Sequence, residues 1–234
     1  MIRNIPNTIS CLNLFCGCLS IVFAFSGRLD IAAYYIIAAA VFDFLDGFAA
    51  RVLKAYSELG KQLDSLADAV SFGVAPASIM YHLLLAAATT YSFAWLIAPL
   101  AYIIAVFSAL RLAKFNIDSR QSDSFIGLPT PANAIFICSL AFISLSDSLS
   151  FITNIFFLLP ATVVLSYLLV AEIPLFSLKF KSYDWKSNKI RYIFVVLSVL
   201  ILLILHLAGL AFVILLYIVL SVITNVKMYR HKNG

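Results

Sequence analysis

The sequence predicts an all-α polytopic membrane protein, a helix bundle with about eight transmembrane helices and both termini on the cytoplasmic side. Hydrophobic residues make up 63% of the 234 residues and charged residues only 12%. A soluble domain needs about a quarter charged residues to cover its surface. The apolar residues also occur in long runs, which match the roughly 20 residues that a helix needs to cross a bilayer.

Eight segments are long and apolar enough to be predicted spans. Short turns such as Ser26-Gly27-Arg28 separate several of them, whereas only the stretch from His206 to Gly209 divides the last pair. In chain order the predicted spans are residues 9–26, 31–53, 62–87, 91–113, 129–146, 150–171, 190–207 and 209–227.

The basic residues predict the orientation of these spans. With eight passes, the two termini and the second, fourth and sixth connections lie on one side of the membrane, and that side holds every Lys and Arg except Arg28. Cytoplasmic loops collect Lys and Arg, so both termini are predicted to be cytoplasmic. These loops also account for the net charge of +5, and no nucleic-acid partner is predicted.

Four aspartates occur where a membrane protein is least expected to carry acids. Asp43 and Asp46 stand three residues apart near the end of the second predicted span, and Asp64 and Asp68 stand four apart in the third. Spacings of three and four place each pair on one face of its helix. Because the connection is short, we expect the four carboxylates to converge at one shallow depth.

Such a cluster requires positive charge, because each buried carboxylate costs a few kcal/mol or more and like charges repel. Oxygen ligands suit Mg²⁺, Mn²⁺ or Ca²⁺ rather than zinc. Two divalent ions would neutralise four carboxylates and could bind a diphosphate. We therefore predict a site for Mg²⁺ or Mn²⁺, with two ions. The alternative is a solvated group of helix-end acids, but the small residues Gly47, Ala50 and Gly60 leave room for a ligand on that face.

The chain from Asp43 to Asp68 reads D-x2-D-G-x2-A-R-x8-G-x3-D-x3-D. This pattern resembles the motif of the CDP-alcohol phosphatidyltransferases at every fixed position. The resemblance implies an enzyme that transfers a phosphatidyl or similar group from a CDP-activated lipid to an alcohol and releases CMP. It implies one membrane domain over 1–234, with a catalytic core over about 1–171 and a C-terminal helix pair over about 190–228. It further implies a homodimer in the cell (inner) membrane, surrounded by membrane lipids, with the active site at the cytoplasmic face.

The same resemblance assigns roles to individual residues. Asp43, Asp46, Asp64 and Asp68 are the implied metal ligands, and Asp68 is also the implied catalytic base that takes the proton of the acceptor hydroxyl. Arg51 suits a bidentate contact with phosphate, and glycines let a nucleotide approach the backbone. The residues implied to bind CDP-diacylglycerol are Asn7, Gly47, Arg51, Ser57 and Gly60.

Three further stretches resemble the phosphatidylserine synthases within this family, and they imply L-serine as the acceptor and phosphatidylserine as the product. These stretches are 6–17, 68–77, and 111–116 together with 127–133. Within the first, Ser10 stands where relatives often carry threonine.

The serine carboxylate needs a cation, and Arg111 and Lys114 are the nearest unassigned ones, with Asn116 and Asn133 as neutral donors. The alternative for the two cations is that they only extend toward the cytoplasmic surface.

Two alternative functions use the same acids. The first is the same transfer with glycerol 3-phosphate or inositol phosphate as the acceptor, although a phosphorylated acceptor should need a more cationic pocket than this chain offers. The second is a cation- or proton-coupled transporter, because such proteins use intramembrane carboxylates. A transporter would be expected to carry them near the midplane, whereas these four lie toward the cytoplasmic ends of their helices.

Overall fold

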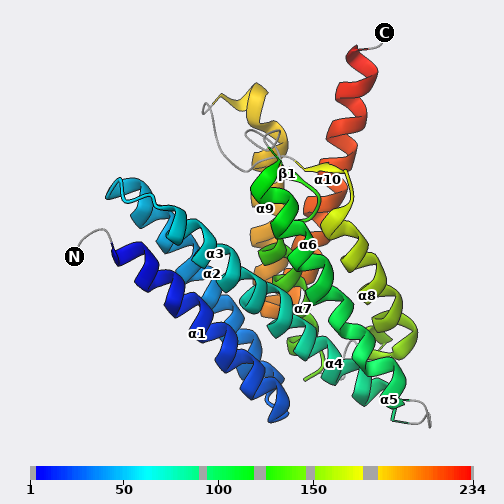
Figure 1. The fold of residues 1–234 in the computed structure, drawn as a ribbon. Helices are drawn as coiled ribbons and strands as arrows, with labels where there is room; N and C mark the ends of the chain where they lie inside the picture. Colours follow the sequence, from blue (N-terminus) through cyan, green and yellow to red (C-terminus); the bar gives the residue numbers. More distant parts are fainter. Residues whose placement is uncertain (1–3, 90–93, 119–124, 146–150, 176–183, 233–234) are drawn as a thin grey trace.

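The computed structural model describes residues 4–89, 94–118, 125–145, 151–175 and 184–232, and helices dominate it (Figure 1). The prediction of an all-α membrane protein is confirmed as far as its fold class is concerned. In chain order the elements are α1 (Ile5–Phe25), α2 (Leu29–Val52), α3 (Glu58–Ala69), the π turn η2 (Val70–Val74), α4 (Ala75–Ala87), α5 (Ala94–Ile97), the 3₁₀ turn η3 (Ala98–Tyr102), α6 (Ile103–Ile117), β1 (Phe125–Ile126), α7 (Thr130–Ile143), α8 (Ile155–Val170), β2 (Pro174–Leu175), α9 (Trp185–Leu205), the 3₁₀ turn η5 (His206–Gly209) and α10 (Leu210–Lys232).

The described helices form eight continuous rods, because α3 runs through the π turn into α4, and α5 runs through η3 into α6. Five stretches are long and apolar enough to cross a membrane. α7 and α8 are apolar but shorter, and the stretch 188–224 contains the turn at His206–Gly209. The eight spans and the side of the termini therefore stay predictions. The five stretches are Ile5–Phe25, Leu29–Val52, Glu58–Ala87, Trp95–Ile117 and Asn188–Thr224.

The first two helices form a tight antiparallel pair. Gly27, with φ of 74°, makes the turn between them, in a left-handed conformation that favours glycine. Fully buried Ala24, Ala32 and Ala33 let the two helices approach closely, as small residues do between membrane helices. The hydroxyl of Ser20 donates to the Ala32 carbonyl oxygen at 2.8 Å, so the pairing is also held by a buried hydrogen bond.

The third rod widens into the π turn Val70–Val74 two residues after Asp68. Other helices approach this turn closely. A Cβ on Gly17 of α1 would lie 2.8 Å from the Ser71 Cα, and a Cβ on Gly73 would lie 3.1 Å from the Ser108 Cβ of α6. Single π turns inside α-helices frequently occur at functional sites, and this one connects α1 and α6 to the helix that carries the acids.

A small clasp, formed by the two short strands β1 and β2, fixes the start of α7. β1 and β2 pair antiparallel, with Phe125 opposite Leu175. Between the clasp and α7, Gly127 adopts φ of 78°, and a Cβ there would lie 2.6 Å from the Leu169 carbonyl oxygen. The first turn of α7 is thereby held against the end of α8.

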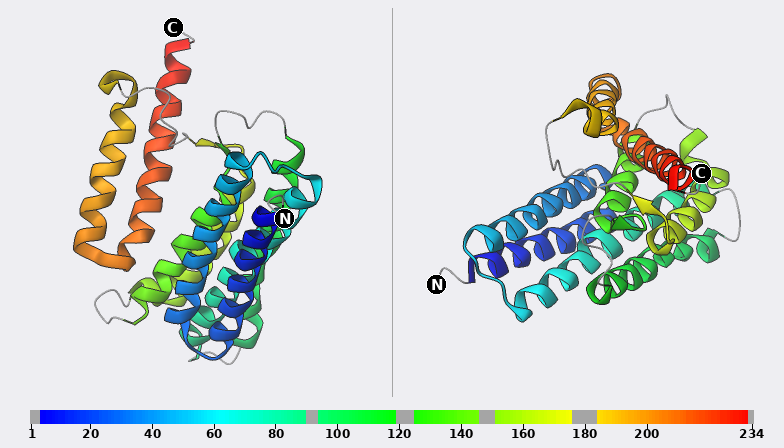
Figure 2. Two further views of the ribbon diagram at one scale, coloured as in Figure 1. Left: turned by 90° about the vertical axis from the view of Figure 1, so that its left-hand side faces the viewer. Right: turned by 90° about the horizontal axis from the view of Figure 1, so that it is seen from above.

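α9 and α10 form an antiparallel hairpin at the side of the other helices (Figure 2). α10 packs against α7. The turn between them lies at His206–Gly209, as the sequence predicts. α1 begins and α10 ends toward the same end of the bundle (Figure 1), as an even number of passes requires.

Cysteine labelling tests the predicted orientation. In a variant without native cysteines, a single cysteine at Ser26 should react with a membrane-impermeant maleimide on intact cells. A single cysteine at Lys54 should react only after permeabilisation, because the predicted cytoplasmic side holds that connection. Both positions are exposed. Labelling of Lys54→Cys on intact cells would contradict the orientation. The native cysteines to be replaced with alanine are Cys11, Cys16, Cys18 and Cys138.

Candidate metal centre and nucleotide cavity

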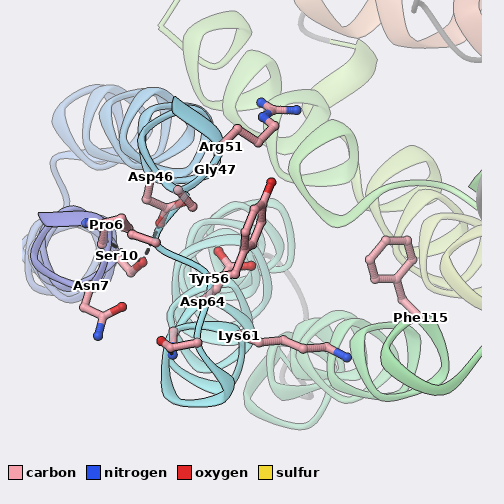
Figure 3. Close-up of a pocket in the computed structure, with 14 residues that line it drawn as sticks. Pro6, Asn7, Ser10, Asp46, Gly47, Arg51, Tyr56, Lys61, Asp64 and Phe115 are labelled. Carbon is pink, nitrogen blue, oxygen red and sulfur yellow. Dashed lines mark hydrogen bonds between the residues drawn. The ribbon is translucent and has the colours of Figure 1, made fainter. Parts of the chain in front are cut away.

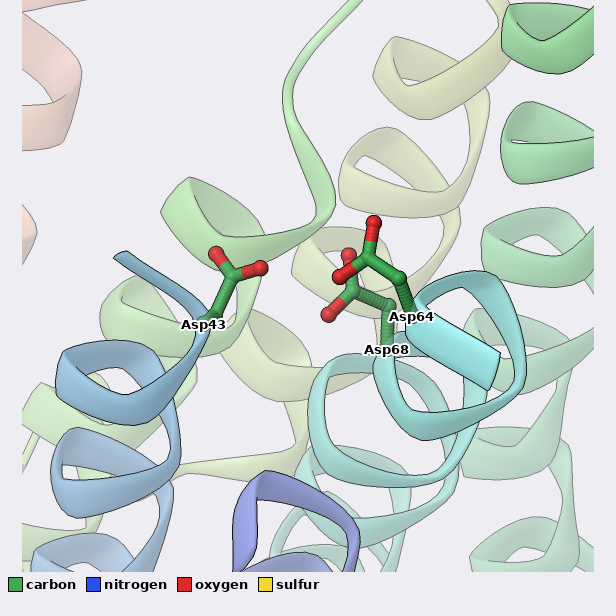
Figure 4. Close-up of side chains that lie close together, drawn as sticks. All are labelled: Asp43, Asp64 and Asp68. Atoms are coloured by element: carbon green, nitrogen blue, oxygen red, sulfur yellow. The ribbon is translucent and has the colours of Figure 1, made fainter. Parts of the chain in front are cut away.

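Three of the four predicted carboxylates converge on one point. Asp43 projects from α2 toward Asp64 and Asp68, which stand one turn apart on α3 (Figure 4). One oxygen of each lies within 4.8 Å of the others. Asp64 Oδ1 is buried and has no hydrogen-bond partner. An unpartnered oxygen in a group of three hard donors fits a divalent cation such as Mg²⁺ or Mn²⁺.

Asp46 is held differently from the other three. Its carboxylate accepts a hydrogen bond of 2.6 Å from the Ser10 hydroxyl of α1, and the residue is only 5% exposed. It does not belong to the three-acid group found among the described residues. It lies close enough to Asp43 and Asp64 for their charges to repel. Its role as a metal ligand therefore stays a prediction.

A cavity of about 600 Å³ opens beside the acids, between the start of α1, the end of α2 and the start of α3 (Figure 3). Both Asp46 and Asp64 line it, so the carboxylates lie at its wall. All five residues that the sequence predicts to bind the nucleotide line it as well. The complete lining is Pro6, Asn7, Ser10, Asp46, Gly47, Ala50, Arg51, Ala55, Tyr56, Ser57, Gly60, Lys61, Asp64 and Phe115.

Local structure explains why two glycines face this cavity. A Cβ on Gly60 would lie 2.9 Å from Asn7 Oδ1 and 3.0 Å from Ser57 Oγ, so these two side chains would have to move. A Cβ on Gly47 would meet no atom within 4 Å. Gly47 is therefore not required by packing, and its missing side chain leaves space inside the cavity.

A known protein family matches the part of the chain that contains these residues. A family model described as CDP-alcohol phosphatidyltransferase matches residues 3–168, which is more than half of the chain and includes both the acids and the cavity. The chain belongs to the CDP-alcohol phosphatidyltransferase family.

Several curated relatives of this family member carry the name CDP-diacylglycerol–serine O-phosphatidyltransferase. The protein of Mycobacterium leprae is 38% identical over 178 residues, 73% of this chain and 57% of the relative. That of Helicobacter pylori strain J99 is 38% identical over 134 residues, which are 56% of this chain and 54% of the relative. That of Bacillus subtilis is 37% identical over 169 residues, which are 72% of this chain and 88% of the relative. The chain thus spans little more than half the length of the first two relatives.

The cations predicted to bind serine differ in their surroundings. Arg111 is 7% exposed, its Nε has no partner, and its guanidinium carbon lies 5.0 Å from the centroid of the Phe115 ring. Lys114, one turn later on α6, is exposed. Both line a small hollow of about 30 Å³ that also contains Glu172. Extension toward the surface therefore describes Lys114 but not Arg111.

The two amides predicted to bind serine also differ. Asn116 Nδ2 donates to the Ser65 hydroxyl of α3 at 2.8 Å, so one of its two N–H groups is already engaged. Asn133 is fully buried in the first turn of α7, and within the described part of the chain neither its Nδ2 nor its Oδ1 has a hydrogen-bond partner. None of the four predicted serine residues lines the larger cavity.

Sequence reasoning assigned no role to several residues that the structure places at the site. Tyr56 and Lys61 line the cavity, Ser10 holds Asp46, and Asn13 donates to Asp68. Ser10 and Asn13 are polar residues three apart in a mostly apolar helix, a signal available in the sequence. Ser57, predicted as a nucleotide contact, is also the N-cap of α3 and accepts from the Gly60 N–H.

Removing one carboxylate should weaken metal binding. Asp43→Asn should lower the affinity of the purified protein for Mn²⁺ by about 10-fold or more, because affinity follows the number of charged ligands. Electron paramagnetic resonance of free Mn²⁺ measures this directly. Asp30→Asn is the matched control, because Asp30 lies at the opposite end of α2 and pairs with Arg28 at 3.4 Å. Equal affinities in the two variants would contradict a metal site at Asp43.

Proposed function

We propose that the chain transfers the phosphatidyl group of CDP-diacylglycerol to L-serine, giving phosphatidylserine and CMP. The observation that carries this proposal is the convergence of three carboxylates beside a cavity that the predicted nucleotide residues line. The names of the relatives support serine as the acceptor.

The cavity suits the nucleotide half of the substrate. Arg51 would pair with a phosphate, Asn7 and Ser57 would supply polar contacts, and Gly47 would leave space for the ligand against the backbone. Two divalent ions held by the four aspartates would neutralise the diphosphate and the charge that develops on the departing CMP. The acyl chains would stay in the lipid, against exposed aromatic side chains of α2 such as Phe44 and Phe48.

Asp68 is the proposed general base. Its carboxylate would take the proton of the serine hydroxyl, and the hydroxyl oxygen would attack the phosphorus of the phosphatidyl group. The bond from that phosphorus to the CMP oxygen would break. Asp68 does not line the larger cavity, whereas Asp64, one turn earlier on the same face, does. The acceptor would therefore approach from the side of α6 and α7.

Arg111 and Asn133 are the proposed serine contacts with the strongest support. Arg111 lies close enough to Asp68 to interact electrostatically, and it packs on Phe115, a residue of the cavity wall. Asn133 offers an amide nitrogen and an amide oxygen that have no hydrogen-bond partner among the described residues. Buried polar groups are normally hydrogen-bonded, so a polar ligand is the partner we propose. Lys114 and Asn116 would act at the rim.

The proposal also covers the membrane location and the oligomeric state of the enzyme. We place the site at the cytoplasmic face of the cell (inner) membrane, where a soluble acceptor and a lipid donor can meet. A homodimer is proposed on the family resemblance alone.

Acceptor comparison tests the function. Purified protein in detergent with CDP-diacylglycerol and Mn²⁺ should release CMP when L-serine is added, and little when glycerol 3-phosphate or inositol phosphate replaces it. Release with a phosphorylated acceptor only would overturn serine as the acceptor. Absence of release with all three would overturn the transferase activity and favour the transporter alternative.

Gly47→Ala separates stability from binding. Alanine is about 1 kcal/mol more favourable than glycine inside a helix, and the new Cβ meets open space, so the melting temperature should hold or rise. The KM for CDP-diacylglycerol should rise by roughly 5- to 150-fold, the effect of about 1–3 kcal/mol of overpacking. Unchanged KM would show that the ligand does not approach this face of α2.

Arg111→Gln should raise the KM for serine and leave that for CDP-diacylglycerol nearly unchanged. A charge-assisted hydrogen bond contributes about 1.5–3 kcal/mol, so the rise should be roughly 10- to 150-fold. Lys114→Gln is the matched control on the same helix and should change serine KM little. Serinol, which lacks the carboxylate, should be a poor substrate for the wild type and lose little more in Arg111→Gln. The same serine KM in both variants would place the carboxylate elsewhere.

A further inference from the structure

Asn13 is a polar side chain in the middle of an apolar stretch of α1, and it is fully buried. Its Nδ2 donates to Asp68 Oδ1 at 3.2 Å, whereas its Oδ1 has no partner. Burying an amide without hydrogen bonds costs free energy, so the residue would be unfavourable here if it served packing alone. Among the described residues, the one hydrogen bond that the Asn13 side chain makes is to Asp68, the proposed base.

The backbone of Asn13 is fixed from the same side. The Ser71 hydroxyl donates to the Asn13 carbonyl oxygen at 2.9 Å, and both groups are buried. This contact depends on Gly17, one turn further along α1, because any side chain at Gly17 would collide with Ser71. Ser71 belongs to the π turn that follows Asp68. α1 and the helix of the base are therefore tied together by two hydrogen bonds, one to the side chain of Asn13 and one to its backbone carbonyl.

We propose that Asn13 is a positioning residue for Asp68, held in place by Ser71. Asp43 and Asp64 repel the Asp68 carboxylate, so without a partner it would rotate away from the site. One N–H bond fixes one carboxylate oxygen and leaves the other for the acceptor hydroxyl and the metal. A neutral donor also suits this place better than Lys or Arg, because a fixed cation would neutralise the base and compete with the metal.

The kinetic consequence rests on the proposed function, whereas the metal-binding consequence does not. At saturating Mn²⁺, Asn13→Ala should lower kcat by about 10- to 100-fold, the usual effect of losing an outer-shell partner of a ligand. KM for both substrates should stay within about threefold, because no substrate contact is lost. The affinity for Mn²⁺ should fall by about 10-fold or more.

Ser20→Ala is the matched control. Ser20 is a fully buried residue of the same helix whose hydroxyl bonds across to α2, away from the site. Both variants remove one buried interhelical hydrogen bond, so they should lower the melting temperature by similar amounts. Only Asn13→Ala should change kcat and Mn²⁺ affinity. Equal kinetics and equal Mn²⁺ affinity in the two variants would overturn the proposal.

A double-mutant cycle shows whether Asn13 acts through Asp68. On the Asp68→Asn background, which should itself reduce turnover by at least about 100-fold, Asn13→Ala should cause no further loss beyond about twofold. Two independent losses that multiply would place the action of Asn13 elsewhere. If Asn13→Ala fails to fold, Ser71→Ala releases the Asn13 backbone and should lower kcat and Mn²⁺ affinity in the same direction.

The two failures are distinguishable. Wild-type protein that binds Mn²⁺ but shows no serine-dependent CMP release would reject the proposed function. The Mn²⁺ affinities of Asn13→Ala and Ser20→Ala would then still decide whether Asn13 positions Asp68.

Discussion

Repulsion among carboxylates that are brought together inside a helix bundle is the constraint on which the rest of this structure depends. None of the four aspartates forms an ion pair with a described Lys or Arg. Neutral donors on α1 hold two of them instead, Ser10 for Asp46 and Asn13 for Asp68. This arrangement leaves the four carboxylates without an ion pair among the described residues, although Arg111 interacts electrostatically with Asp68. A ligand that brings positive charge would relieve their mutual repulsion.

The tight packing of the first three rods follows from that constraint. Hydrogen bonds from neutral donors act only at short range, so α1 must lie close to both acid-bearing helices. Small residues permit it: alanines between α1 and α2, Gly17 of α1 against the π turn, and Gly60 of α3 against Asn7 of α1. The cavity occupies the remaining space, where the loop after α2 separates the helix ends.

Much of this arrangement is predictable from sequence, because helical periodicity places Asp43 with Asp46 and Asp64 with Asp68 whatever the remaining packing is. Gly47 and Arg51, four apart on α2, share one face for the same reason, whereas Asn7, Ser57 and Gly60 reach the cavity through the packing of α1 and α3. Periodicity could not separate Arg111 from Lys114, which stand three apart on one helix. Their difference arises from packing, because Arg111 is buried with its guanidinium over the Phe115 ring, whereas Lys114 is exposed. Nor could it separate Asp46 from its three neighbours, because the partner that holds it lies on another helix. The π turn leaves no compositional trace.

The π turn also determines the rotational phase of the third rod. Each residue turns an α-helix by about 100°, so one additional residue in a turn sets the angle between everything before it and everything after it. Before the turn, Asp64 and Asp68 face the site; after it, Ala75, Ile79 and Met80 are fully buried in the core. If the rod were one residue shorter here, either the aspartates would turn away from the site or the later residues would turn out of the core. The length of this rod is therefore constrained by the site and by the core at the same time.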